Sequence, residues 1–252
     1  MEQFIKANMS KTGIAEIVFS NPPHNALNSA MLAKLTEEII SADQNDNVQI
    51  IVVKSGGERA FCAGASFDEL MTIKNEQEGF QFFMGFANLI NAIRKSRCLV
   101  IGMVQGKTVG GGVGLASAFD YCFATNYAAI KLSELSIGIG PFVISPAVIR
   151  KIGKTAFAQL TLNPFEFKSA EWAFQKGLYS EVFDSQEEME EACIQLVEKL
   201  AATNPEARAE IKQTMWKGTE DWDALFESLA KKSGKLVLSE FTQTALSKFR
   251  KD

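Results

Sequence analysis

The sequence has few of the residues from which metal and disulfide sites are built. Among 252 residues there is one histidine, His24, and there are four cysteines. The cysteines are widely scattered, and the chain contains neither a CxxC pair nor an HExxH motif. This spacing is more typical of buried thiols in a reducing compartment than of a disulfide framework. We therefore predict no metal site. The four cysteines are Cys62, Cys98, Cys122 and Cys193.

Excess positive charge and long hydrophobic runs are also missing. The net charge is −4 and the isoelectric point is about 5.3, so the basic footprint of a nucleic-acid-binding protein is absent. No apolar run approaches the ~20 residues that span a bilayer. Residues 1–13 lack the basic region and apolar stretch of a secretory signal. We expect a cytoplasmic protein that binds neither nucleic acid nor membrane.

Short apolar runs that alternate with longer amphipathic ones predict an α/β fold. The helical spacing of apolar residues in 29–42 and 80–94 predicts two helices, and Asn28 stands at an N-cap position. The first helix would bury Met31, Leu32, Leu35, Ile39 and Ile40. Helices between strands indicate right-handed crossovers and a largely parallel sheet. The predicted strands, rich in β-branched and aromatic residues, are 14–19, 48–53, 98–104 and 120–125.

The pattern changes after about residue 184. Ser185 and Glu188 form a capping box, which predicts a helix through roughly Ala201. Asn204-Pro205 would begin another helix, and residues 221–249 carry apolar positions at helical spacing. A helical segment appended to an α/β core often covers that core or a neighbouring subunit. We predict a core at 1–184 and a helical region at 185–252.

A glycine-rich run, QGKTVGGGVGLA at 105–116, directly follows one predicted strand. Glycines let a backbone approach a ligand closely, and the first amides of a helix favour negative charge. A purely structural turn would give the same pattern. Two nucleotide-binding motifs fail, because a Walker A loop needs glycine where Ile101 stands and a dinucleotide fingerprint needs it at Leu115.

Several segments together resemble the crotonase, or enoyl-CoA hydratase/isomerase, superfamily. FCAGASFDEL at 61–70 is similar to its F-x-A-G-A-D segment, and VGGGVGLA at 109–116 is similar to its G-G-G-x-E-L-A turn. Further matches follow the family's order: NPPHNALN at 21–28, SELSIG at 133–138, KSAEWA at 168–173 and GLY at 177–179. The resemblance implies a spiral of ββα units, a C-terminal helical trimerisation region and a homotrimer or hexamer.

The resemblance also implies a site for an acyl-CoA thioester. By resemblance, the amides of Ala65 and Gly111 form an oxyanion hole and Glu134 is the catalytic acid/base. Fixed donors aimed at the thioester oxygen stabilise the charge that develops when the α-proton leaves. No cofactor is implied, since coenzyme A is part of the substrate. The other predicted substrate-binding residues are Asn25, Ala26, Leu27, Ala63, Ser66, Phe67, Gly110, Pro141 and Phe142.

One carboxylate of the family's hydratase pattern is missing. The resemblance places the hydratase glutamates at Gly114 and Glu134, and a third carboxylate of dienoyl-CoA isomerases at Phe142. Only Glu134 is acidic, and residues 139–144 give an apolar wall that would raise its pKa. Adding water divides its proton transfers between two glutamates, whereas moving a double bond needs one base. We therefore expect isomerisation ahead of one-glutamate hydration, with a non-catalytic acyl-CoA-binding homologue as a further alternative.

The weaker candidates have structural explanations. His24 has no partner in sequence, Cys62 has the character of a core residue, and Ser66 replaces the family's aspartate. No motif selects the cations that would bind the CoA phosphates. The candidates are Lys54, Arg59, Lys74, Lys231, Lys232 and Lys248.

Overall fold

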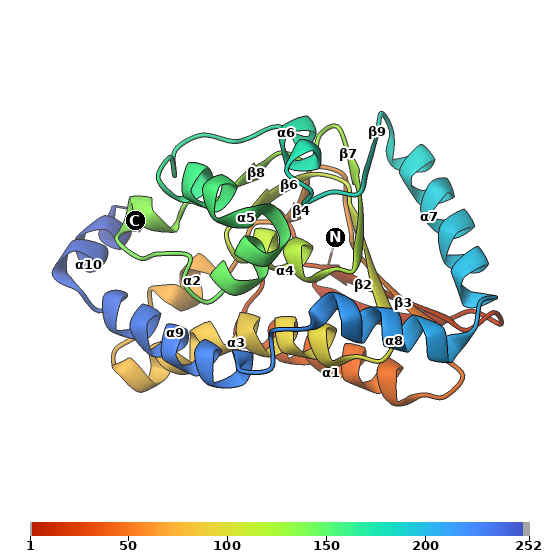
Figure 1. The fold of residues 1–252 in the computed structure, drawn as a ribbon. Helices are drawn as coiled ribbons and strands as arrows, with labels where there is room; N and C mark the ends of the chain where they lie inside the picture. Colours follow the sequence, from red (N-terminus) through yellow and green to blue (C-terminus); the bar gives the residue numbers. More distant parts are fainter. Residues whose placement is uncertain (1, 249–252) are drawn as a thin grey trace.

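The computed structural model describes residues 2–248, in which two β-sheets are surrounded by helices (Figure 1). The larger sheet has the order β1-β2-β3-β5-β7-β9, with β1 antiparallel to β2 and the other pairs parallel. The smaller sheet is parallel and has the order β4-β6-β8. The larger sheet comprises β1 (Phe4–Met9), β2 (Ile14–Ser20), β3 (Ile50–Ser55), β5 (Leu99–Val104), β7 (Tyr121–Thr125) and β9 (Glu181–Phe183). The smaller sheet comprises β4 (Ala60–Cys62), β6 (Lys107–Val109) and β8 (Ile130–Lys131).

Three successive units each place one strand in the larger sheet and the next in the smaller sheet. The units are β3-β4-α3, β5-β6-α4 and β7-β8-α5, and this order confirms the predicted spiral of ββα units. A short helix, α2, intervenes before α3, and the 3₁₀ helix η1 before α5. The helices are α1 (Ser29–Gln44), α2 (Phe67–Leu70), α3 (Glu76–Lys95), α4 (Gly111–Ala118), η1 (Glu134–Ile137), α5 (Ser145–Thr161) and α6 (Ala170–Gln175).

The central strands are buried on both faces, which explains why they read as continuous apolar runs. Successive side chains of a strand point to opposite faces. In β3, Ile51 and Val53 therefore join the main core, while Ile50 and Val52 pack in a second cluster with Met189 of α7 (Gln186–Ala201). Helix α7 thus covers one face of the larger sheet, and the main core fills the other.

The C-terminal helices begin where the sequence predicts. Ser185 caps α7 by accepting from the Glu188 amide at 3.1 Å, and Asn204 caps α8 (Pro205–Trp216). Two more helices follow, α9 (Trp222–Leu236) and α10 (Glu240–Ser247). No strand follows β9 within the part of the chain that the structure describes. Residue 1 and residues 249–252, the ends of the two predicted regions, lie outside it.

The tail folds back over its own core (Figure 1). Helix α9 crosses α3 where Gly79 faces Gly234, and a Cβ on Gly79 would lie only 2.7 Å from the Cα of Gly234. Helix α10 packs against the end of η1, where Phe241 and Thr242 contact Gly138. The tail therefore packs against both α3 and the end of η1.

A buried ion pair attaches α8 to the larger sheet. Lys212 Nζ lies 2.9 Å from Asp120 Oδ2, and both side chains are almost fully buried. The same ammonium donates to the Cys98 carbonyl at 2.6 Å, and Trp216 Nε1 donates to Asp120 Oδ1 at 2.7 Å. Burial lowers the pKa of Lys212, and the nearby Asp120 carboxylate opposes this effect. Each charge is thus compensated by hydrogen bonds, which a buried pair requires.

Some elements differ from the sequence prediction. The strands β1, β4, β6, β8 and β9 were not predicted from the apolar runs, because four of them have at most three residues and β1 is an edge strand with mostly exposed side chains. Ile40 was predicted to be buried and is 43% exposed. It lies at the border of the apolar stripe of α1, beside the buried Ile39.

Replacing Lys212 by methionine should lower the free energy of unfolding by about 3–5 kcal/mol, since it leaves the Asp120 carboxylate buried without its cation. Chemical denaturation measures this change. The exposed Lys199 of α7 provides a matched control, for which the same substitution should change stability by at most about 0.5 kcal/mol. Equal small effects at both positions would contradict a compensated buried pair.

Candidate active site

Two loops meet at the start of α4. The loop after β4 is held by Leu27, whose amide donates to the Gly64 carbonyl at 2.8 Å and whose carbonyl accepts from Ser66 at 2.9 Å. Gly64 has a φ of +88°, and a Cβ there would lie 2.9 Å from the Val109 carbonyl oxygen and 3.3 Å from the Gly111 nitrogen. Only glycine permits this backbone and this approach.

The amides of Ala65 and Gly111 have no acceptor among the residues that the structure describes. Gly111 is the first residue of α4, so its amide is one of those that a helix leaves unpaired. Ala65 forms a parallel bridge with Leu27 through the neighbouring peptide groups, and its own amide is not used. Both residues line the same pocket. Two free N–H groups therefore stand at one cavity, as an oxyanion hole requires.

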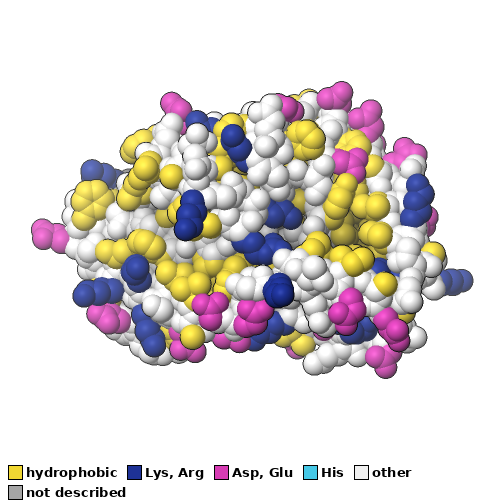
Figure 2. All heavy atoms as spheres, in the orientation of Figure 1, with side chains coloured by type: hydrophobic (Ala, Val, Ile, Leu, Met, Phe, Trp, Pro, Cys, Tyr) yellow, Lys and Arg dark blue, Asp and Glu magenta, His cyan; other side chains and the backbone are white. Residues whose placement is uncertain are grey.

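The pocket has a volume of about 100 Å³ and a mostly apolar lining. One wall comes from α3, which contributes Phe82, Phe83 and Phe86, and another from residues 139–144, the predicted apolar segment. Figure 2 shows apolar side chains gathered on the face between α9 and α5, with lysines and arginines around them. This lining favours an acyl chain over a polar metabolite.

Glu134 is the only acidic residue among the described residues that line this pocket. It begins η1, and a Cβ on Gly110 would lie 2.9 Å from its Oε1 atom. Its Oε2 atom is inaccessible and has no hydrogen-bond partner in the described part of the chain. Burial raises the pKa of Glu134 to about 7, opposed by a hydrogen bond from its own amide. A carboxyl group with this pKa can both accept and return a proton near neutral pH.

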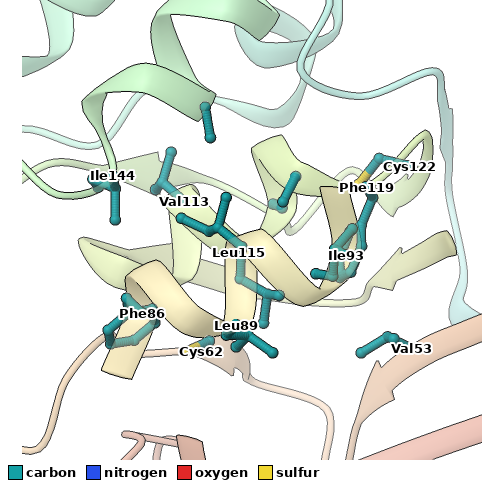
Figure 3. Close-up of a cluster of buried hydrophobic side chains, with 14 of the residues drawn as sticks. Val53, Cys62, Phe86, Leu89, Ile93, Val113, Leu115, Phe119, Cys122 and Ile144 are labelled. Atoms are coloured by element: carbon teal, nitrogen blue, oxygen red, sulfur yellow. The ribbon is translucent and has the colours of Figure 1, made fainter. Parts of the chain in front are cut away.

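Ile144 closes the position at which the resemblance places the second hydratase glutamate. A Cβ on Gly114 would lie 2.4 Å from Ile144 Cγ2 and 2.6 Å from its Cβ. Figure 3 shows Ile144 next to Val113 of α4, and both residues belong to the main core. The missing carboxylate is therefore replaced by packed hydrocarbon, and no side chain fits at residue 114 without displacement of Ile144.

The predicted binding residues fall into two groups. Ala63, Phe67, Gly110, Pro141 and Phe142 line the pocket together with the three predicted catalytic residues. The other four are not among the lining residues and instead hold the loops. Asn25 Nδ2 donates to the carbonyls of Gly56 and Ala60, and the Ala26 carbonyl accepts from Asn21 Nδ2. Leu27 is hydrogen-bonded to the 64–66 loop through its backbone, and Ser66 Oγ accepts from the Glu69 amide.

The structure separates the cation candidates. Lys232 lies 5.1 Å from the ring centre of Phe142, which lines the pocket, so this tail lysine is next to the pocket wall. Lys231 lies 5.8 Å from the ring centre of Phe80, which is not a lining residue. Lys54 is instead paired with Glu16 at 2.9 Å. Lys232 is thus a candidate that contacts a residue of the pocket wall.

His24 and Cys62 keep structural roles. His24 is exposed, and its carbonyl accepts from the Ala63 amide at 3.1 Å. Cys62 is fully buried, and burial raises the pKa of its thiol to about 12. A thiol with this pKa is not a nucleophile near neutral pH.

Three features of the site were missed from sequence. Phe82 of α3 lines the pocket beside Phe83, and Ile144 fills the space above Gly114. Ser233 of the tail also lines the pocket. The density of phenylalanine in α3 could have indicated an aromatic wall, but no local pattern places Ser233 next to residues far away in the chain.

Within residues 2–248, no cluster of three or more histidine, cysteine or acidic side chains has the geometry of a metal site. None of the helices described is both long and apolar enough to cross a membrane.

Comparison with known proteins identifies the family. The model of the enoyl-CoA hydratase/isomerase family matches residues 9–248, so the chain belongs to this family. A 2,3-dehydroadipyl-CoA hydratase from Escherichia coli is 31% identical and covers 78% of this chain and 75% of its own length. An ethylmalonyl-CoA decarboxylase from Xenopus tropicalis is also 31% identical, over 51% of this chain. The match spans less than half, 43%, of that relative's length.

The fold matches solved structures of the same kind. An enoyl-CoA hydratase from Bacillus halodurans superposes with a TM-score of 0.90 over 97% of this chain and 99% of its own, at 18% identity. At this identity the likeness concerns the fold. The chain thus has the crotonase fold and belongs to the enoyl-CoA hydratase/isomerase family.

The raised pKa of Glu134 predicts a pH-dependent loss of stability. From its ordinary value near 4.5 up to about 7, the folded protein holds a proton that the unfolded chain releases, so stability falls as pH rises through this window. Glu134→Gln does not titrate. The unfolding free energy of this variant minus that of the wild type should therefore increase by about 1–3 kcal/mol between pH ~4.5 and ~8. Urea denaturation at both pH values measures it, and a pH-independent difference would contradict a buried carboxyl group.

The contact between Gly114 and Ile144 predicts that Gly114→Ala is destabilising. Alanine normally favours a helix, but here its methyl group would overlap Ile144, at a cost of about 1–3 kcal/mol. The penalty should shrink when Ile144 is replaced by glycine, because the overlapping atoms are then gone. Thermal unfolding of the four proteins of this double-mutant cycle gives the coupling, and additive effects would show that residue 114 has free space.

Proposed function

We propose that this protein moves the double bond of an enoyl-CoA thioester from the 3,4 to the 2,3 position, with Glu134 as the single acid/base. The observation that carries the proposal is one buried carboxyl group in a pocket whose second carboxylate position is closed by Ile144. Family membership supports an acyl-CoA substrate. The apolar pocket lining supports the binding of an acyl chain, and the raised pKa of Glu134 supports its role as the acid/base.

In this mechanism the thioester carbonyl oxygen accepts hydrogen bonds from the amides of Ala65 and Gly111. The Glu134 carboxylate removes a proton from C2, and the electrons of the broken C–H bond delocalise into a dienolate whose charge rests mainly on the thioester oxygen. The Glu134 carboxyl then returns the proton to C4, which leaves a double bond between C2 and C3. Each preorganised donor of this kind is worth about 2.7–4 kcal/mol in other acyl-transfer enzymes.

Three features support isomerisation over hydration. Hydration needs a positioned water and a second group to divide the proton transfers. The neighbourhood of Gly114 is filled by Ile144, and residues 139–144 present hydrocarbon to the pocket. An isomerase needs only a base that reaches both C2 and C4, and exclusion of water protects its dienolate.

We also propose that the protein forms homotrimers or hexamers, as the family resemblance implies. Large apolar side chains after α5 are strongly exposed in the single chain, with Leu162 at 75% and Phe165 at 76%. Exposed apolar groups of this size are typical of surfaces that bind another chain.

A parallel assay of trans-3-enoyl-CoA and trans-2-enoyl-CoA tests the reaction. The wild type should generate the absorbance of a conjugated thioester from the 3-enoyl substrate and consume none from the 2-enoyl substrate. Loss of absorbance from the 2-enoyl substrate would establish hydration instead.

Glu134→Gln should lower kcat by about 10²–10⁴-fold while saturated acyl-CoA still binds, because it removes the base and keeps the side-chain shape. The exposed carboxylate of Asp68, in α2 beside the site, provides the control, and Asp68→Asn should keep wild-type kcat. Full activity of Glu134→Gln would remove this residue from the mechanism.

A further inference from the structure

A single hydroxyl group from the C-terminal region faces the pocket without a partner. Ser233 of α9 is 1% exposed and lines the pocket, and its Oγ atom has no hydrogen-bond partner among residues 2–248. Buried hydroxyls are normally hydrogen-bonded, so an exception needs an explanation.

Two other helical hydroxyls in this protein are hydrogen-bonded within their own helix. Ser117 Oγ donates to the Val113 carbonyl at 2.7 Å, and Thr214 Oγ1 donates to the Glu210 carbonyl at 2.8 Å, one helical turn back in each case. This is the usual arrangement for such residues within helices. Ser233 does not make that bond, so its hydroxyl remains available to a group in the pocket.

Ser233 lies at the end of the pocket away from the oxyanion amides. The ring of Phe86 contacts Gly111, since a Cβ on that glycine would lie 2.4 Å from it, whereas Gly79 of the same helix contacts Gly234. Seven residues of α3 separate these contacts, or roughly 10 Å at about 1.5 Å per residue. An acyl chain held at Gly111 would run along the phenylalanines of α3 to reach Ser233.

The surroundings of Ser233 restrict the chemistry of that partner. In the described chain no lysine or arginine lines the pocket, and Lys232 lies over the Phe142 ring without being a lining residue. A carboxylate on the ligand would lose its water shell here and gain only one hydrogen bond, from the neutral Ser233 hydroxyl, which is unfavourable. A neutral oxygen, such as a hydroxyl or carbonyl, is suited to one hydroxyl group in an apolar wall.

We infer that the acyl-CoA substrate carries an uncharged hydrogen-bonding oxygen near the far end of its acyl chain and that Ser233 selects it. The inference rests on the proposed function, because it assumes that the thioester lies at Ala65 and Gly111. A plain alkyl chain would leave the Ser233 hydroxyl buried and unpaired, whereas an oxygenated chain satisfies both partners.

Binding of two saturated acyl-CoA thioesters of equal length, ending in a methyl or in a hydroxyl group, tests this without turnover. We expect Ser233→Ala to reduce the preference for the hydroxyl form, the ratio of the two Kd values, by roughly 5- to 100-fold. Isothermal titration at several chain lengths measures it. Alanine favours a helix, so the variant should fold.

Thr161 provides the control, because its buried hydroxyl also lacks a described partner but does not line the pocket. Thr161→Val should leave the ratio unchanged. An unchanged ratio in Ser233→Ala, at every chain length, would overturn the inference, as would a wild-type preference for a carboxylate terminus. If 3-enoyl-CoA is bound but not converted, the proposed reaction fails while the binding ratio still decides the role of Ser233.

Discussion

The close approach of two backbone segments determines how this site is built. Gly64 brings the loop after β4 against Val109 and Gly111, and neither the φ of +88° nor the distance permits a side chain. The amides of Ala65 and Gly111 then reach one cavity from two successive turns of the spiral. The ββα arrangement provides this meeting, because β4 and β6 are neighbours in the smaller sheet and the two loops follow them directly.

Glu134 depends on the same framework. The next strand of the smaller sheet, β8, leads into η1, which places the carboxyl group against Gly110. The absence of a side chain at Gly110 makes room for that carboxyl group, and the absence of one at Gly114 makes room for Ile144. The tail completes the enclosure, since α9 packs on α3 through Gly79 and Gly234. Burial desolvates the carboxyl group of Glu134, and this desolvation raises its pKa.

Much of this arrangement was predictable from sequence, for identifiable reasons. The buried strands at β3 and β5 are strongly apolar, and the caps at Asn28 and Ser185 are local features that the structure confirms. Motif order indicated the ββα spiral and the residues around Glu134. The pairing of β4, β6 and β8 was not visible, because strands of two or three residues carry no periodicity. The contact of Ile144 with Gly114 and the place of Ser233 in the pocket were also missed, since both come from contacts between distant segments.

The central claim is that one shielded carboxyl group carries the proton from C2 to C4. Conversion of trans-3-enoyl-CoA in heavy water, followed by mass spectrometry of the product, tests it most directly. The account predicts a conjugated enoyl-CoA with little deuterium at C4, because a proton held by Glu134 in a dry pocket returns before it exchanges. Deuterium at C4 approaching the solvent level, or a hydroxyacyl-CoA product, would contradict the account.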